Sequence, residues 1–178
     1  MTADKTKPPV RKSILVIEFV IFSLTGWLYE TIYTSAMWGR FADRGFLHIP
    51  ICPIYGFFAF GIIGIFYRRK ASIPVIYIIS TLIVGTLEYL SSYLIEKIFH
   101  LKLWDYSYMK YHINGRVSVI ICLCFGAACV LLIKLFHPKL YTLLAKLMPA
   151  KASEITAIIL IVIILADTTL CTIQMFAK

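Results

Sequence analysis

Two glutamates, Glu30 and Glu88, lie inside long apolar stretches, where an ionisable side chain is costly by about 2.5–3.5 kcal/mol and is a functional candidate. Each sits about 15 residues from the predicted inner end of its stretch, or roughly 22 Å at the rise of a helix. We therefore expect both carboxylates in the outer third of a membrane, where they could handle a substrate, an ion or a proton. The alternative is that Arg116, tyrosine hydroxyls or backbone groups satisfy them and that they only fix helix packing.

Small and polar residues recur around each glutamate at intervals of three or four. This spacing puts them on one helical face, and such faces form helix–helix interfaces in membranes. We predict that the two stripes face each other or a shared cavity. The stripes are Ser23, Gly26, Glu30 and Thr34, and Thr81, Gly85, Glu88 and Ser92.

Five other ionisable residues are placed by their expected depth in the membrane. Arg116 and His48 are expected near the level of the two glutamates, and Asp167 lies near the middle of the last apolar stretch, where an acid must face protein or water. Glu18 and Glu96 lie near helix ends, so headgroup contact favours a structural role for each.

The sequence predicts no metal site and no cofactor. Cys122 and Cys124 are two residues apart on a helix and do not share a face, and no C-x-x-C pair is present. A G-x-x-x-x-G-K-[ST] phosphate loop is also missing, so the chain does not hydrolyse ATP with such a loop.

Long apolar stretches must position these residues. The chain is 60% hydrophobic and 15% charged, with a mean hydropathy of +0.84, against about 45–50% and about 25% in soluble domains. A helix needs about 20 apolar residues to cross the hydrocarbon layer. These values predict an all-α, polytopic transmembrane helical bundle with about five spans and exclude a soluble globular domain. The expected spans are 14–37, 51–66, 73–95, 117–136 and 155–176.

Basic residues set the expected orientation. Of the 18 Lys and Arg residues, 11 fall in the inner segments if the N-terminus is inside, which favours N-in and C-out. Residues 1–12 are then a cytoplasmic tail and 13–178 a single transmembrane domain in the cell membrane. The net charge of +9 indicates contact with anionic membrane lipids and not with nucleic acid.

Two parts of the sequence resemble each other in the order of their features. The helix with Gly26 and Glu30 and the helix with Gly85 and Glu88 are each followed by an aromatic segment. A further helix then follows in each case. It has a glycine in its first half, Gly56 after the first aromatic segment and Gly126 after the second. This order suggests a parallel two-helix repeat of the kind found in transporters. Chance similarity between apolar sequences is the alternative.

Five short motifs resemble those of a family of small bacterial membrane proteins, described as putative ABC-transporter type IV, over about residues 15–140. They are Gly26-Trp-Leu-Tyr-Glu30, Arg44-Gly-Phe-Leu47 with Pro50-Ile-Cys-Pro-Ile-Tyr-Gly56, Glu88-Tyr-Leu90, Trp104-Asp-Tyr-Ser107 and Asn114-Gly-Arg116. The resemblance implies a permease and marks Glu30, Arg44, Glu88, Trp104, Asp105, Asn114 and Arg116 as site candidates in the outer half. Relatives tend to have Leu-Asn-Gly-Pro where this chain has Leu47-His48-Ile49-Pro50, so a shared role does not carry over to His48.

Three functions fit these observations. A permease-like membrane component would need an ATPase partner, an ion gradient or a homo-oligomer that encloses a path. A membrane enzyme acting on a lipid or lipid-linked substrate is a second possibility, ranked lower because no nucleophile–base pair is visible. A non-catalytic sensor or scaffold is the third, with the polar stripes serving oligomerisation.

Overall fold

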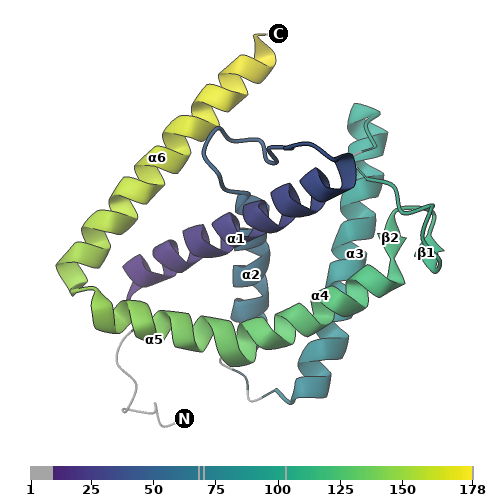
Figure 1. Ribbon diagram of the computed structural model, residues 1–178. Coiled ribbons are helices and arrows are strands. Elements are labelled where there is room, and N and C mark those ends of the chain that lie inside the picture. Colours follow the sequence, from purple (N-terminus) through teal and green to yellow (C-terminus); the bar gives the residue numbers. More distant parts are fainter. Residues whose placement is uncertain (1–9, 68, 70, 103, 178) are drawn as a thin grey trace. The chain divides into compact units, whose positions relative to one another are not determined.

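The computed structural model describes residues 10–67, 69, 71–102 and 104–177, and its regular structure is almost entirely helical (Figure 1). This confirms the predicted all-α class. A single antiparallel hairpin, β1 (His112–Ile113) with β2 (Val117–Ser118), precedes α4. The helices are α1 (Lys12–Trp38), α2 (Pro53–Phe66), α3 (Ile73–Phe99), α4 (Val119–Leu131), the π-helical turn η1 (Leu132–Phe136), α5 (His137–Leu147) and α6 (Ala150–Phe176).

Four helical stretches among the described residues are long and apolar enough to cross a membrane: α1, α3, the continuous run from Val119 to Leu147, and α6. The second predicted span, 51–66, is shorter than expected. Its helix α2 has 14 residues, or about 21 Å, which is less than the roughly 30 Å hydrocarbon layer. Pro53 begins this helix, and the Cys52 N–H group bonds to the Ser23 carbonyl instead of entering a helical ladder. The chain is a multi-pass membrane protein.

The predicted fourth span ends at residue 136, but the helix continues through η1 into α5. Arg11 holds the end of α5. Its Nη1 donates to the Met148 carbonyl at 2.9 Å and its Nη2 to the Ala145 carbonyl at 2.6 Å. These bonds satisfy carbonyls that a helix C-terminus leaves without partners. The last part of the predicted tail is therefore docked, while residues 1–9 of that tail lie outside the described residues.

The chain divides into two compact units, one of residues 10–60 with 138–177 and one of residues 61–137. In the first, α1 packs against α6, and the Ser13 and Ser153 hydroxyls are 2.9 Å apart. Glu18 on α1 is completely buried, so the expected headgroup contact is wrong. In the second unit, α3 and α4 pack closely. One domain over 13–178 stays a prediction.

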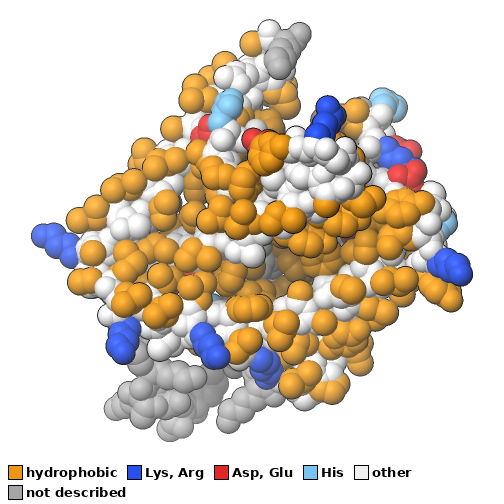
Figure 2. All heavy atoms as spheres, in the orientation of Figure 1, with side chains coloured by type: hydrophobic (Ala, Val, Ile, Leu, Met, Phe, Trp, Pro, Cys, Tyr) orange, Lys and Arg blue, Asp and Glu red, His pale blue; other side chains and the backbone are white. Residues whose placement is uncertain are grey.

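Apolar side chains remain exposed along the helices, as Figure 2 shows for α6. Exposed isoleucine, valine and leucine side chains occur on successive turns from Ile155 to Ile173. In water such a surface would drive association, whereas lipid tails solvate it. The long helices are therefore built to face hydrocarbon.

Candidate functional site

Glycines bring the second helix of each hairpin onto the glutamate-bearing helix. A Cβ on Gly56 would overlap the Ser23 hydroxyl, and one on Gly126 would overlap the Thr81 hydroxyl. Both hydroxyls donate to the carbonyl four residues earlier at 2.8 Å. Glycine permits such close approach of two helices in a membrane. The pairs α1–α2 and α3–α4 thus repeat one contact.

Glu30 lies seven residues beyond Ser23 and is held by the start of α2. The Tyr55 hydroxyl donates to Glu30 Oε1 at 2.7 Å, and its ring occupies the space that a Cβ on Gly26 would need. Arg44 Nε lies 3.6 Å from Glu30 Oε2, and about a third of the Glu30 side chain is exposed. The carboxylate is partnered yet accessible.

Glu88 lies seven residues beyond Thr81 and also has a tyrosine partner, which comes from the segment before β1 and not from the following helix. The Tyr106 hydroxyl donates to Glu88 Oε1 at 2.8 Å, and the Cys122 thiol lies 3.7 Å from Oε2. Burial, followed by the neighbouring carboxylate, raises the pKa of Tyr106 well above its ordinary value. The phenol therefore stays protonated and remains a hydrogen-bond donor.

Arg116 pairs with Glu96 and not with Glu88, which lies in the same unit. Its Nη1 lies 2.5 Å from Glu96 and 3.2 Å from the Ser92 hydroxyl, and its guanidinium sits 5.6 Å above the centre of the Tyr93 ring. Glu30 and Glu88 each accept a hydrogen bond from a tyrosine hydroxyl within their own unit. The two glutamates lie in different units, so a shared cavity between the stripes stays a prediction.

Two motifs between α3 and α4 pack on each other. Trp104 Nε1 donates to the Arg116 carbonyl at 2.9 Å, and the Tyr106 N–H group donates to the Gly115 carbonyl at 2.8 Å. Gly115 has φ +68, and the Asp105 carboxylate lies where its side chain would be. Only glycine suits both conditions. The motifs therefore build a scaffold that positions Tyr106 and Arg116.

Asp105 and Asn114 belong to this scaffold. Asp105 Oδ1 accepts the Ser107 N–H group at 2.9 Å, and its Oδ2 accepts Lys102 Nζ at 2.6 Å. Asn114 adopts a left-handed conformation with φ 52, and its Nδ2 donates to the Tyr89 hydroxyl at 3.1 Å. Their hydrogen bonds stay within the loop and its anchor on α3, so they shape the site, and a direct role of either residue in binding stays a prediction.

The Asp105 hydrogen bonds predict a pH-dependent loop. Lys102, followed by the Ser107 groups, holds the pKa of Asp105 well below its ordinary value. Because the folded pKa lies below the unfolded value of about 3.9, the stabilisation is complete above that pH and is lost as pH falls below it. The protection factors for hydrogen exchange of residues 104–116, which correct for the intrinsic pH dependence of exchange, should therefore fall as pH drops below about 4. Asp105→Asn should exchange faster at neutral pH and lose this acid dependence, and identical profiles in both proteins would contradict the assignment.

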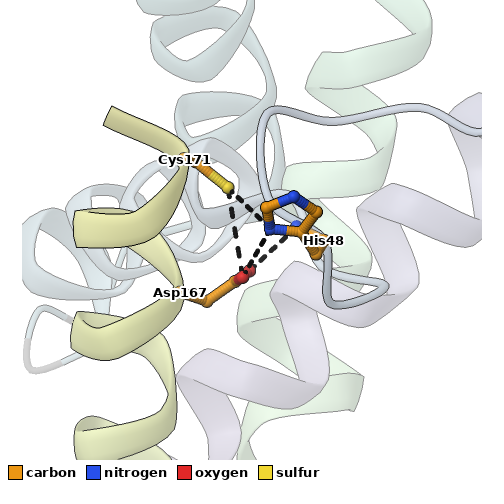
Figure 3. Close-up of side chains that lie close together, drawn as sticks. All are labelled: His48, Asp167 and Cys171. Carbon is orange, nitrogen blue, oxygen red and sulfur yellow. Dashed lines mark hydrogen bonds and ion pairs between the residues drawn. The ribbon is translucent and has the colours of Figure 1, made fainter. Parts of the chain in front are cut away.

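A second group of polar residues joins the loop after α1 to α6. His48 Nδ1 lies 2.8 Å from Asp167 Oδ1 and 3.1 Å from Cys171 Sγ. The backbone N–H groups of His48 and Ile49 donate to Asp167 Oδ2 at 2.8 and 3.1 Å. Figure 3 shows the three side chains pointing toward one another. Asp167, expected near the middle of its helix, therefore reaches the loop that carries His48.

Sequence reasoning named the glutamates but missed several of their partners. Tyr55, Tyr106, Cys122 and Cys171 each contact a predicted site residue. Two of them had a usable signal, since Tyr55 and Tyr106 fall inside the motifs that carry the family resemblance. Cys171 lies one helical turn from Asp167, which is also visible in the sequence.

Comparison with known families decides the relationship. The family described as "Putative ABC-transporter type IV" matches residues 17–172. The chain belongs to this family. No curated protein and no solved structure matches the sequence. As a member of this family with long apolar helices, the chain is a membrane protein related to transport.

Proposed function

We propose that the chain is a permease-like membrane component of a transport system and that Glu30 and Glu88 bind the substrate or a coupling ion. The observation that carries this proposal is the repetition of one arrangement. In each hairpin, a glutamate seven residues beyond a serine or threonine accepts a hydrogen bond from a tyrosine. A packing device needs no such duplication at matching positions, whereas paired intramembrane carboxylates are typical of ion and proton pathways.

The chemistry of each glutamate suits reversible binding. A tyrosine donates one hydrogen bond to one carboxylate oxygen and leaves the second oxygen with a weak partner. That partner is Arg44 at 3.6 Å for Glu30 and the Cys122 thiol at 3.7 Å for Glu88. Either oxygen can therefore accept a proton or a cationic group without breaking the tyrosine bond. Since the chain has no phosphate loop of its own, an ATPase partner or an ion gradient would supply the energy.

Substitutions that remove only the negative charge test this proposal. We expect Glu30→Gln and Glu88→Gln to abolish transport while the proteins still fold, because glutamine keeps the size and a hydrogen-bond acceptor for tyrosine. Cells lacking the gene would be compared with cells complemented by each variant. Untargeted mass spectrometry of small molecules inside and outside the cells is the measurement, because it requires no prior choice of substrate.

The matched control is Glu154→Gln, which changes an exposed glutamate on α6. Species that shift on gene deletion should return to normal with the wild-type chain and with Glu154→Gln, but not with Glu30→Gln or Glu88→Gln. If Glu30→Gln and Glu88→Gln both restore these species fully, at equal amounts of protein in the membrane, the glutamates are not needed for transport.

A further inference from the structure

We propose that His48, Asp167 and Cys171 form a binding site for a divalent transition-metal ion, with zinc as the best match. This inference does not depend on the role of Glu30 and Glu88, and it departs from the sequence-based expectation of no metal. The three residues supply a nitrogen, an oxygen and a sulfur ligand, and these atoms all lie within 4.8 Å of one another. Zinc is bound by this combination of histidine, carboxylate and thiolate ligands.

The distances fit a common centre. Bond lengths of about 2.0–2.3 Å and tetrahedral geometry put neighbouring zinc ligands roughly 3.3–3.6 Å apart. The observed separations are 2.8 Å between Nδ1 and Oδ1, 3.1 Å between Nδ1 and Sγ, and 4.0 Å between Sγ and Oδ1. Changes of about half an ångström, within reach of side-chain rotation, would therefore complete three tetrahedral positions.

Hydrogen bonds alone explain the arrangement of these three side chains poorly. Both Asp167 and Cys171 approach the same nitrogen, Nδ1 of His48 (Figure 3). A single proton on Nδ1 satisfies the carboxylate and leaves the thiol with only a long hydrogen bond of 4.0 Å to Asp167 Oδ1. A nucleophilic relay would instead need the thiol and the carboxylate on different ring nitrogens. A divalent ion satisfies all three atoms, and one thiolate plus one carboxylate balances its charge.

The surroundings support the ligand set. Asp167 and Cys171 are one helical turn apart on α6, so both face the same way. Asp167 Oδ2 is fixed by the two backbone N–H groups of His48 and Ile49, which is the kind of outer-shell support that orients a metal ligand. The Asp167 side chain is 11% exposed, while that of His48 is 56% exposed. An ion can therefore enter from the histidine side.

A fourth coordination position is available to a small molecule or water. A cavity of about 270 Å³ adjoins the cluster and is lined by Phe46, His48, Cys171, Gln174 and Met175. Structural zinc sites usually have four protein ligands, whereas three ligands beside an open cavity are typical of sites that exchange a ligand. The site would tie the loop after α1 to α6 and still bind an exogenous group.

Metal titration of the purified full-length protein tests the proposal. We expect one equivalent of Zn²⁺ to bind, and Co²⁺ to give the thiolate charge-transfer and visible absorption of a tetrahedral site. Cys171→Ser and His48→Gln should weaken binding by about 100-fold or more, since loss of an outer-shell partner already costs about 10–100-fold. Cys124→Ser, at an exposed cysteine on α4, is the matched control and should bind as the wild type.

Cysteine alkylation of the wild-type protein gives a readout that does not depend on the folding of variants. Peptide mapping should show Cys171 protected by Zn²⁺ and alkylated after addition of a chelator, with Cys124 alkylated equally in both states. One-equivalent binding together with this protection would establish the site. Equal alkylation of Cys171 with and without Zn²⁺, or unchanged binding in Cys171→Ser, would overturn it.

Discussion

Replacing Gly126 with leucine should destabilise the α3–α4 pair by about 3 kcal/mol, since overpacking costs typically 1–3 kcal/mol and occasionally more. A Cβ at this position would overlap the Thr81 hydroxyl and lie 3.1 Å from the Tyr77 carbonyl oxygen. The hydroxyl can rotate away, but the carbonyl belongs to the α3 backbone, so the helices must separate. The temperature of unfolding in detergent is the measurement. Gly56→Leu should have a similar effect through Ser23.

Gly61 and Gly64 on α2 provide matched controls. Among the described residues, and apart from the adjoining residues and the nearby backbone of α2 itself, no heavy atom lies within 4 Å of a Cβ built on either glycine. Gly61→Leu and Gly64→Leu should therefore leave the unfolding temperature near that of the wild type or raise it slightly, because leucine favours a helix more than glycine does. If Gly126→Leu unfolds at the same temperature as Gly61→Leu, the close contact between α3 and α4 is wrong.

Replacing Asp167 with alanine should release the loop after α1. The carboxylate accepts the backbone N–H groups of His48 and Ile49, and its removal leaves two donors without their protein acceptor. A hydrogen bond to a charged group contributes about 1.5–3 kcal/mol. Trypsin cleavage after Arg40 and Arg44, which precede His48 in this loop, should therefore accelerate by about tenfold or more, since 1.4 kcal/mol corresponds to a factor of ten.

Asp167→Asn separates the loop contact from the proposed metal site. An asparagine oxygen can still accept both N–H groups, so trypsin cleavage should remain close to the wild-type rate. The neutral amide is a poor ligand for zinc, so metal affinity should still fall. Equal cleavage rates for Asp167→Ala and the wild type would show that the carboxylate does not hold this loop.

Apolar runs in the sequence predicted the helices because, in lipid, a segment must form its backbone hydrogen bonds within itself. Each backbone polar group must be bonded within the segment, so a long apolar run becomes a helix wherever it lies in the fold. The same reasoning overestimated α2. Pro53 and the bond from Cys52 to Ser23 start the helix late, and the latter contact depends on how the loop returns to α1.

The spacing of small residues was equally informative for the glutamates. Thr81 and Gly85 lie against α4, and Glu88 and Ser92 contact residues of the segment that connects α3 to α4. One helical face thus carries the packing and the candidate site, as the intervals of three and four predicted. The identity of the partners did not follow. Arg116 could pair with any acid within reach, and the fold of the loop places it on Glu96.

The sequence alone determined that ionisable groups would lie in a helical membrane protein, and where along each helix they would fall. These are properties of composition and period, which act over a few residues. Tertiary structure decided which groups meet. His48 is 119 residues from Asp167 and 123 from Cys171, and no local pattern encodes so distant a contact. Glu30 and Glu88 were predictable as positions, whereas the tyrosines that hold them and the histidine cluster were set by how the loops fold.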